Sequence, residues 1–179
     1  MKIIFITGGS RSGKSSYALE LSEQRAGKRA FIATAEPLDD EMRLRIDAHK
    51  RQRSDVWETF EEPVRLSEMI SELIEPYDVV LVDCLTLWLS NILMREPFPE
   101  IEAVTKEIDD FISNLKKLNA SQSKDTYLYL VSNEVGMSIV PDNKLARVFR
   151  DAAGLLNQQV ADEADEVFFV VSGLPLKLK

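Results

Sequence analysis

The chain has 179 residues, of which 45% are hydrophobic and 29% are charged, and its formal net charge is -8. This balance excludes an intrinsically disordered chain, and we expect residues 1–179 to form a single domain. The acidic charge argues against general binding to nucleic acid or to an anionic membrane, so any phosphate must be bound at a local site. No apolar stretch approaches the roughly 18 residues that span a bilayer, and Met1–Thr7 is too short for a secretory leader. The only cysteine, Cys84, excludes an internal disulfide, and a reducing cytoplasm is the expected location.

The first predicted strand, Lys2–Thr7, runs directly into residues 8–15, which read Gly-Gly-Ser-Arg-Ser-Gly-Lys-Ser and fit the phosphate-binding pattern G-x-x-x-x-G-K-[ST]. Glycines let the backbone turn so that several N–H groups point at one anion, and the helix predicted over Ser16–Gln24 adds its positive end. In this pattern Lys14 reaches the β- and γ-phosphates of a nucleotide, and the Ser15 hydroxyl binds magnesium. The alternative is a strand–turn–helix corner with an incidental lysine.

After a second predicted strand, Arg29–Thr34, the only histidine of the chain falls on a predicted helix. The acidic segment Asp39–Glu41 begins this helix, with Asp39 or Asp40 as its cap. An apolar side and a basic side of the helix meet at His49. The basic side is the densest group of cations in the chain: Arg45, Lys50, Arg51 and Arg53. Positive neighbours favour the neutral, nucleophilic ring and would hold a polyphosphate, which suits nucleotidyl transfer through a phosphoramidate. The alternative, a surface histidine on a solvated helix face, is the commoner use of such a residue.

A third strand is predicted over Val79–Cys84, and Asp83 lies near its C-terminal end. A carboxylate at this end of a buried strand is suited to hold magnesium, whereas the alternative is a cap for the helix that begins near Leu85. Glu61 is a further candidate, either as a hydrogen-bond acceptor for ribose or guanine or as an ordinary exposed acid.

The second half of the chain continues the alternation of strands and helices. Apolar side chains at helical spacing predict helices over Ile101–Leu118 and Leu145–Val160. The remaining predicted elements are strands over Tyr127–Ser132 and Val167–Ser172, a short edge strand over Leu174–Lys179, and loops over Arg95–Pro99 and Asn119–Asp125. The predicted strands are apolar at nearly every position, which is typical of strands buried on both faces. We therefore predict an α/β fold with a mostly parallel sheet flanked by helices. Asn133 and Glu134 follow a strand at its C-terminal end, where a binding role and a turn-forming role are equally plausible.

Together these features resemble the bifunctional adenosylcobinamide kinase / adenosylcobinamide-phosphate guanylyltransferase family. The resemblance runs over nearly the whole chain. The phosphate loop within Thr7–Ser15 is generic by itself, but together with the segment Asp39–His49 and the turn Asn133–Met137 it is specific to this family. It implies a RecA-like P-loop fold, a trimer, magnesium, and two reactions. The first phosphorylates the aminopropanol hydroxyl of adenosylcobinamide with ATP or GTP. The second transfers GMP from GTP to that phosphate, releases pyrophosphate and passes through a guanylylated histidine.

The resemblance also implies individual roles. It places the guanylylated histidine at His49. The catalytic role of Lys14 in phosphate binding, and Ser15 and Asp83 as magnesium ligands, are predicted from the phosphate-loop pattern and from the end of the buried strand. The implied nucleotide contacts are Gly8, Gly9, Ser10, Arg11, Ser12, Gly13, Lys14, Ser15, Thr34, Ala35, Glu36, Lys50, Arg51, Gln52, Arg53, Glu61 and Asp83. Two other functions are compatible with the residues: a monofunctional P-loop kinase for a small molecule, and a RecA-like nucleotide-binding switch. A nucleic-acid motor is disfavoured by the net charge of -8.

Overall fold

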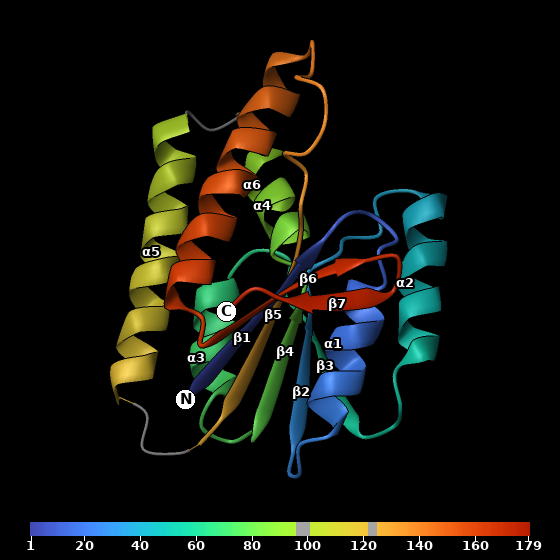
Figure 1. Ribbon diagram of the computed structural model, residues 1–179, viewed down its shortest axis with the longest axis vertical. Helices are drawn as coiled ribbons and strands as arrows, with labels where there is room; N and C mark the ends of the chain where they lie inside the picture. The colour runs from blue at the N-terminus through green and yellow to red at the C-terminus, as the bar shows by residue number, and fades with distance from the viewer. Residues whose placement is uncertain (96–100, 122–124) are drawn as a thin grey trace.

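The centre of the structure is a seven-stranded sheet whose strands pair in the order β3-β2-β4-β5-β1-β6-β7 (Figure 1). The computed structural model describes residues 1–95, 101–121 and 125–179, and only the backbone of residues 45 and 52. The strands are β1 (Lys2–Gly8), β2 (Arg29–Ala33), β3 (Trp57–Glu61), β4 (Val79–Asp83), β5 (Tyr127–Asn133), β6 (Glu166–Val171) and β7 (Leu174–Lys177). The helices are α1 (Lys14–Glu23), α2 (Asp40–Gln52), α3 (Leu66–Leu73), α4 (Leu85–Leu93), α5 (Ile101–Ser121) and α6 (Lys144–Glu163).

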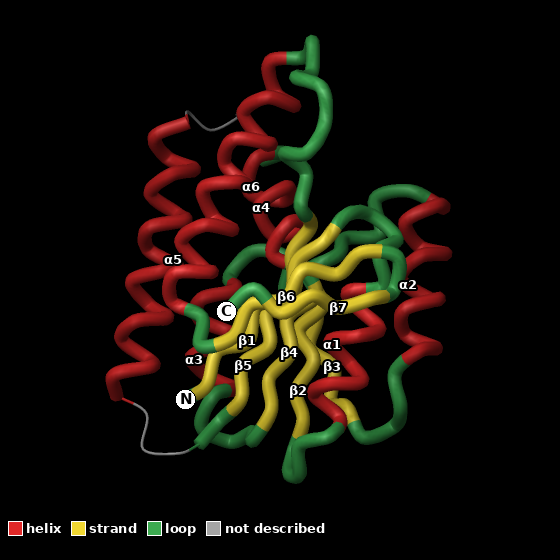
Figure 2. Tube along the Cα trace, viewed as in Figure 1, coloured by secondary structure: helices red, strands yellow, loops and turns green. Residues whose placement is uncertain are grey.

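Strands β1 to β6 pair in parallel, and only β7 runs antiparallel, to β6. Helices α3 to α6 cover one face of the sheet, and α1 and α2 lie on the other (Figure 2). The four neighbouring strands β2, β4, β5 and β1 are apolar at nearly every position because each is buried on both of its faces. This arrangement confirms the predicted α/β class. No helix in the described part of the chain is long and apolar enough to cross a bilayer.

Most predicted elements are confirmed, with ends that differ by at most three residues. Helix α1 begins at Lys14, so the end of the phosphate loop is already helical. The loop predicted from Asn119 is wrong over its first three residues, because α5 continues to Ser121. Residues 122–124 of that loop, and all but Arg95 of the loop predicted over Arg95–Pro99, lie outside the described residues.

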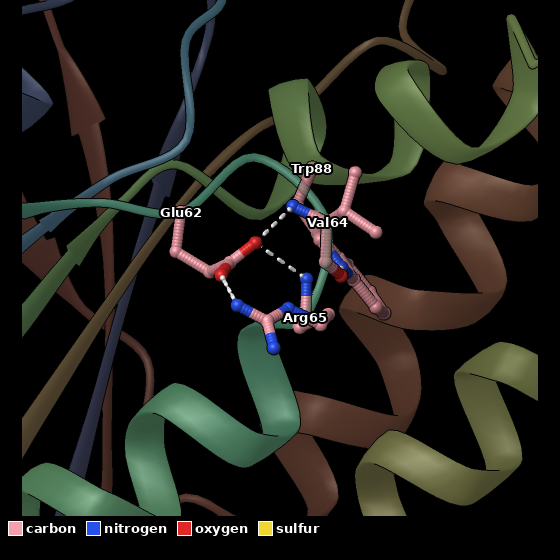
Figure 3. A network of polar contacts seen from close by, with 4 residues as sticks. All are labelled: Glu62, Val64, Arg65 and Trp88. Atoms are coloured by element: carbon pink, nitrogen blue, oxygen red, sulfur yellow. Dashed lines mark hydrogen bonds and ion pairs between the residues drawn. The ribbon is translucent and has the colours of Figure 1, made fainter.

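A buried carboxylate holds the connection between β3 and α3 (Figure 3). One carboxylate oxygen of Glu62 accepts hydrogen bonds from the backbone N–H groups of Val64 (3.0 Å) and Arg65 (2.8 Å), and the other pairs with the Arg65 guanidinium (3.2 Å). The Trp88 indole donates to the Val64 carbonyl, which ties α4 to the same connection. Burial alone would raise the pKa of Glu62, but the hydrogen bonds from Arg65 and Val64 and the charge of Arg65 lower it. The Glu62 N–H donates to the carbonyl of Ala33, the last residue of β2, at 3.0 Å, so the same residue also joins the end of β3 to the end of β2.

Candidate functional site

The phosphate loop is the connection from β1 to α1, residues 8–15, and the surrounding backbone determines its path. An added Cβ atom at Gly8 would lie 2.4 Å from the carbonyl oxygen of Val170 on β6, so no larger residue fits without moving that strand. Gly13 is the N-cap of α1 and has a φ of 93°, a left-handed conformation that favours glycine. The N-terminus of α1, with its unpaired N–H groups, therefore faces the loop, as anion binding requires.

The turn between β6 and β7 holds this loop from the far end of the chain. Its two residues, Ser172 and Gly173, both have positive φ, as a two-residue hairpin with a right-handed strand twist needs. The Gly173 N–H donates a 2.8 Å hydrogen bond to the carbonyl oxygen of Ser12. In a trans peptide the C=O and N–H groups point in opposite directions. Because the Ser12 carbonyl is turned toward the hairpin, the N–H of Gly13 is turned away from it.

Lys14 is nearly buried at the start of α1, and its ammonium group donates to the Gly9 carbonyl at 3.1 Å. Burial lowers the pKa of Lys14, while Cys84 and Asp83 nearby act to raise it. A cation desolvated by the protein binds an entering phosphate more strongly than one in water.

Asp83 and Asn133 lie at the carboxyl edge of the sheet, at the ends of neighbouring strands. Asp83 pairs with Val131 in register, and Asn133 pairs with Gly8. Since side chains alternate along a strand, Asp83 and Asn133 both point to the face that α1 covers. The N-cap of α4 is Cys84, which makes no side-chain cap hydrogen bond. The alternative prediction, that Asp83 is the N-cap of α4, is therefore wrong.

Two pockets lie between this edge of the sheet and α2. The phosphate-loop pocket has a cavity volume of about 420 Å³. It is lined by Ser10, Arg11, Ser12, Gly13, Lys14, Ser15, Ser16, Ala35, Met42, Ile46, His49, Asp83, Cys84, Leu87 and Asn133. Burial, and then the charge of Asp83, raise the pKa of the Cys84 thiol to about 12, so this thiol stays protonated at neutral pH.

The second pocket, which we call the aromatic pocket, has a volume of about 360 Å³. It is lined by Phe31, Ala33, Ala35, Pro37, Arg43, Ile46, Asp47, His49, Lys50, Arg53, Glu61, Asp83 and Leu87. The Arg53 guanidinium stacks 4.1 Å from the centre of the Phe31 ring, and burial lowers the pKa of Arg53. Lys50 pairs with Glu61 at 2.7 Å.

The two pockets form one cleft, because five residues line both: Ala35, Ile46, His49, Asp83 and Leu87. His49 lies on α2, whose N-cap is Asp39, one of the two predicted caps: the Asp39 carboxylate accepts a 2.6 Å hydrogen bond from the Met42 N–H. His49 is exposed, and no described side chain of α2 is buried. The ring of His49 is thus accessible from the cleft rather than packed in the core.

The structure brings most of the predicted site residues into the cleft: Ser10 to Ser15, Ala35, His49, Lys50, Arg53, Glu61 and Asp83. Others do not line it. Thr34 is fully buried, and its hydroxyl donates to the Cys84 carbonyl and accepts from the Cys84 N–H. Glu36, Arg51, Gly8 and Gly9 are absent from both linings. The side chain of Gln52 lies outside what the structure describes.

Sequence reasoning did not single out the apolar walls of the cleft. Phe31 comes from the middle of β2, and Leu87 from the first turn of α4, so neither belongs to a local motif. An aromatic residue in a buried strand normally belongs to the core, so the sequence indicates a buried position for Phe31 but not a place in the site.

The family described as cobinamide kinase / cobinamide phosphate guanyltransferase, CobU, matches residues 4–178. The bifunctional adenosylcobalamin biosynthesis protein CobU of Escherichia coli is 42% identical, and that of Salmonella typhimurium is 44% identical, each over 99% of both chains. The bifunctional adenosylcobalamin biosynthesis protein CobP of Pseudomonas aeruginosa is 37% identical over 97% of this chain and 95% of its own.

Solved structures agree on the fold. An ATPase from the type III secretion system of pathogenic bacteria superposes with a TM-score of 0.56 at 12% identity, over 98% of this chain but only 56% of that one. The RadB recombinase superposes with a TM-score of 0.53 at 14% identity, over 94% of this chain and 73% of that one. At such identities the likeness concerns the fold alone, and it confirms the predicted RecA-like P-loop class.

Proposed function

The chain belongs to the cobinamide kinase / cobinamide phosphate guanyltransferase family, and we propose that both reactions take place in the single cleft beneath α2. The observation that carries this proposal is the position of His49, which lines both the phosphate-loop pocket and the aromatic pocket. A nucleotide with its phosphates on the loop and its base in the aromatic pocket would pass this ring. In this proposal residues 1–179 act as one P-loop nucleotide-binding domain.

In the kinase reaction, ATP or GTP phosphorylates the aminopropanol hydroxyl of adenosylcobinamide. The hydroxyl oxygen forms a bond to the γ-phosphorus, the bond from that phosphorus to the bridging oxygen breaks, and the nucleoside diphosphate leaves. We propose that Lys14 and the N–H groups of residues 10–15 hold the β- and γ-phosphates and spread the charge that develops during transfer. The proton of the hydroxyl is released to water in the same reaction.

In the guanylyl transfer, a ring nitrogen of His49 forms a bond to the α-phosphorus of GTP. The bond from that phosphorus to the α,β-bridging oxygen breaks, and pyrophosphate leaves. A phosphate oxygen of adenosylcobinamide phosphate then attacks the same phosphorus, the P–N bond breaks, and adenosylcobinamide-GDP is released with free His49. The covalent intermediate divides one difficult transfer into two displacements. The exposed position of His49 supports this role, because a nucleophile must be accessible to both substrates.

The residues at the edge of the sheet fit a magnesium ion. Magnesium prefers oxygen ligands and commonly takes one or two from the protein, with the rest from water and substrate phosphates. The Asp83 carboxylate and the Ser15 hydroxyl both line the phosphate-loop pocket and are the proposed protein ligands. When bound, magnesium would neutralise charge on the phosphate oxygens. Among the described residues no group of three or more histidine, cysteine or acidic side chains is placed to hold a metal by itself.

The aromatic pocket is the proposed base site. Phe31 and Arg53 form a stacked pair on one wall, and Glu61 offers a carboxylate to ribose or guanine. Lys50 pairs with Glu61 and holds that carboxylate toward the pocket. We propose these contacts as the reason why the second reaction uses GTP.

Covalent labelling tests the proposal. The protein is incubated with magnesium and GTP labelled at the α-phosphate, then denatured and analysed for an adduct that is labile in acid and stable in base. We expect wild-type protein to carry one such label and His49→Ala to carry none, while His49→Ala keeps part of the kinase activity. Unchanged labelling of His49→Ala would exclude His49 as the nucleophile. Absence of any label on wild-type protein would favour a monofunctional kinase.

Two further features are proposed from the family resemblance. The first is a trimer, supported by exposed apolar side chains on β7, where Leu174 and Leu176 are 73% and 59% exposed. Sedimentation equilibrium would show three chains per particle. The second is a cytoplasmic location, supported by a free, buried Cys84 that needs no oxidising compartment.

A further inference from the structure

Asn133, the last residue of β5, lies in the cleft between the two elements that the proposed function uses for phosphate and magnesium. Strand β5 lies between β4, which ends at Asp83, and β1, which leads into the phosphate loop. In register Asn133 is level with Gly8. Its side chain points to the α1 face and lines the phosphate-loop pocket together with Lys14 and Asp83.

The backbone of Asn133 is held on both sides by polar side chains from helices. The hydroxyl of Thr86 on α4 accepts from the Asn133 N–H at 2.5 Å, and the amide of Asn157 on α6 donates to the Asn133 carbonyl at 3.0 Å. Thr86 also hydrogen-bonds the Ser132 hydroxyl at 3.0 Å. Thr86, Asn157 and Ser132 are all at least nine-tenths buried. Burying polar groups costs free energy, so their shared use at one residue indicates that its position matters.

The carboxamide of Asn133, by contrast, has no hydrogen-bond partner among the residues that the structure describes. A carboxamide offers two donors and one acceptor and carries no charge at any pH. It can donate to a phosphate oxygen and accept from a hydroxyl group, but it cannot serve as a general base. Fixed and unpaired beside Lys14 and Asp83, it is available to a substrate.

The linings of the two pockets indicate which end of the nucleotide Asn133 meets. His49 and Asp83 line both pockets, whereas Asn133 and residues 10–16 line only the phosphate-loop pocket. If the base occupies the aromatic pocket, the α-phosphate passes His49 and the γ-phosphate lies farther along, beside the loop. Asn133 is then a neighbour of the γ-phosphate and of the group that attacks it.

We propose that the Asn133 carboxamide contacts the γ-phosphoryl group and the acceptor hydroxyl, and is a catalytic residue of the kinase reaction but not of guanylyl transfer. This inference rests on the proposed function, because it assumes that both reactions share the cleft. Positioned donors of this kind act on charge that develops in the transition state and therefore affect kcat more than KM.

The experiment compares the two reactions in the same variant. In Asn133→Ala we expect kcat for phosphorylation of adenosylcobinamide to fall about a hundredfold, with KM for GTP within about threefold of wild type. Labelling of His49 by α-labelled GTP should keep its wild-type rate within about threefold. Asn133→Asp places a negative charge beside the γ-phosphate, so it should weaken binding of GTP more than binding of GMP. Thermal unfolding shows that each variant is folded.

Three results would overturn the inference: kinase turnover near wild type in Asn133→Ala, an equal loss of both reactions in a folded variant, or equal weakening of GTP and GMP binding in Asn133→Asp. An equal loss of both reactions would show that Asn133 maintains the shape of the whole cleft and does not act in the kinase reaction alone. Failure of the proposed function gives a different result, since wild-type protein itself would then form no guanylylated His49. In that case the kinase measurements still decide the role of Asn133.

Discussion

The buried carboxylate of Glu62 allows a stability prediction in which size and pH dependence are both determined by the structure. Glu62→Gln keeps the shape of the side chain and one acceptor oxygen but removes the charge. Glu62 is 6% exposed, and one of its oxygens accepts from two backbone N–H groups, those of Val64 and Arg65. The partner guanidinium of Arg65 is 72% exposed, so the ion pair itself contributes little.

The expected loss of stability in Glu62→Gln follows from these two hydrogen bonds to backbone N–H groups. A hydrogen bond to a charged group contributes about 1.5–3 kcal/mol, and one to a neutral group about 0.5–1.5 kcal/mol. Each bond therefore loses about 1 kcal/mol, and Glu62→Gln should lower the free energy of unfolding by about 2 kcal/mol at neutral pH. For a chain of this size that corresponds to a fall in Tm of about 4–8 °C.

The contribution of Glu62 to stability should be lost in acid. The pKa of Glu62 is lowered in the folded protein from an ordinary value of 4.5. Its contribution to stability is therefore present above the unfolded pKa and is lost as the pH falls through the lower, folded pKa. The stability difference between wild type and Glu62→Gln should be constant from pH 7 down to the region of pH 4.5 and then shrink toward zero.

Urea denaturation of both proteins at a series of pH values measures this difference. Glu68→Gln, on an exposed residue in the first turn of α3, makes the same chemical change without a buried acceptor and is the matched control. It should alter the free energy of unfolding by no more than about 0.5 kcal/mol. A Glu62→Gln difference that stays constant down to pH 3, or grows in acid, would refute the reasoning about Glu62.

Three further predictions concern the phosphate loop. Lys14→Ala should abolish both reactions in activity assays, because each needs the polyphosphate to be held, and turnover near wild type in either would contradict this role. Gly8→Ala should lower the free energy of unfolding in urea by about 1–3 kcal/mol, since its Cβ would lie 2.4 Å from the Val170 carbonyl oxygen. Gly9→Ala is the control, because its Cβ would meet nothing within 4 Å. Gly173→Val should weaken pyrophosphate binding in calorimetry more than Gly173→Asn does, because asparagine tolerates the φ of 79°; equal effects would exclude a role of the turn in phosphate binding.

Local patterns in the sequence predicted the sheet well where strands are buried on both faces. β1, β4 and β5 are continuous apolar runs, and their observed ends lie within one residue of the predicted ends. β3 (Trp57–Glu61) was not predicted, because it is an edge strand in which most side chains are exposed and its sequence shows no apolar run. The eight-residue helix α3 was not predicted either, since its apolar face spans only two turns.

The candidate site could be predicted from the sequence only as far as local motifs extend. The phosphate loop, Asp83 and the helix that carries His49 each have a local signature, and the structure brings them into one cleft. The hydrogen bond from Gly173 to Ser12 joins residues at opposite ends of the chain, and no local pattern reports it. The position of Thr34 near the site was predictable, because it follows a predicted strand. Its hydroxyl, however, hydrogen-bonds to the backbone of Cys84, and this contact depends on the register of β2 and β4, which the sequence does not report.

The order of strands supports the proposal that one cleft serves both reactions. Strand β4 lies between β2, which leads to the aromatic pocket, and β5, which ends at Asn133, so Asp83 occupies the middle of the cleft. Asp83 would hold magnesium there, and the ion would supply charge neutralisation to the phosphates of the bound nucleotide. In this proposal both reactions use the same charge neutralisation, and they differ in the phosphorus that is attacked and in the group that attacks it. On this reasoning, replacing Asp83 must impair both reactions, whereas replacing His49 or Asn133 must impair one of them.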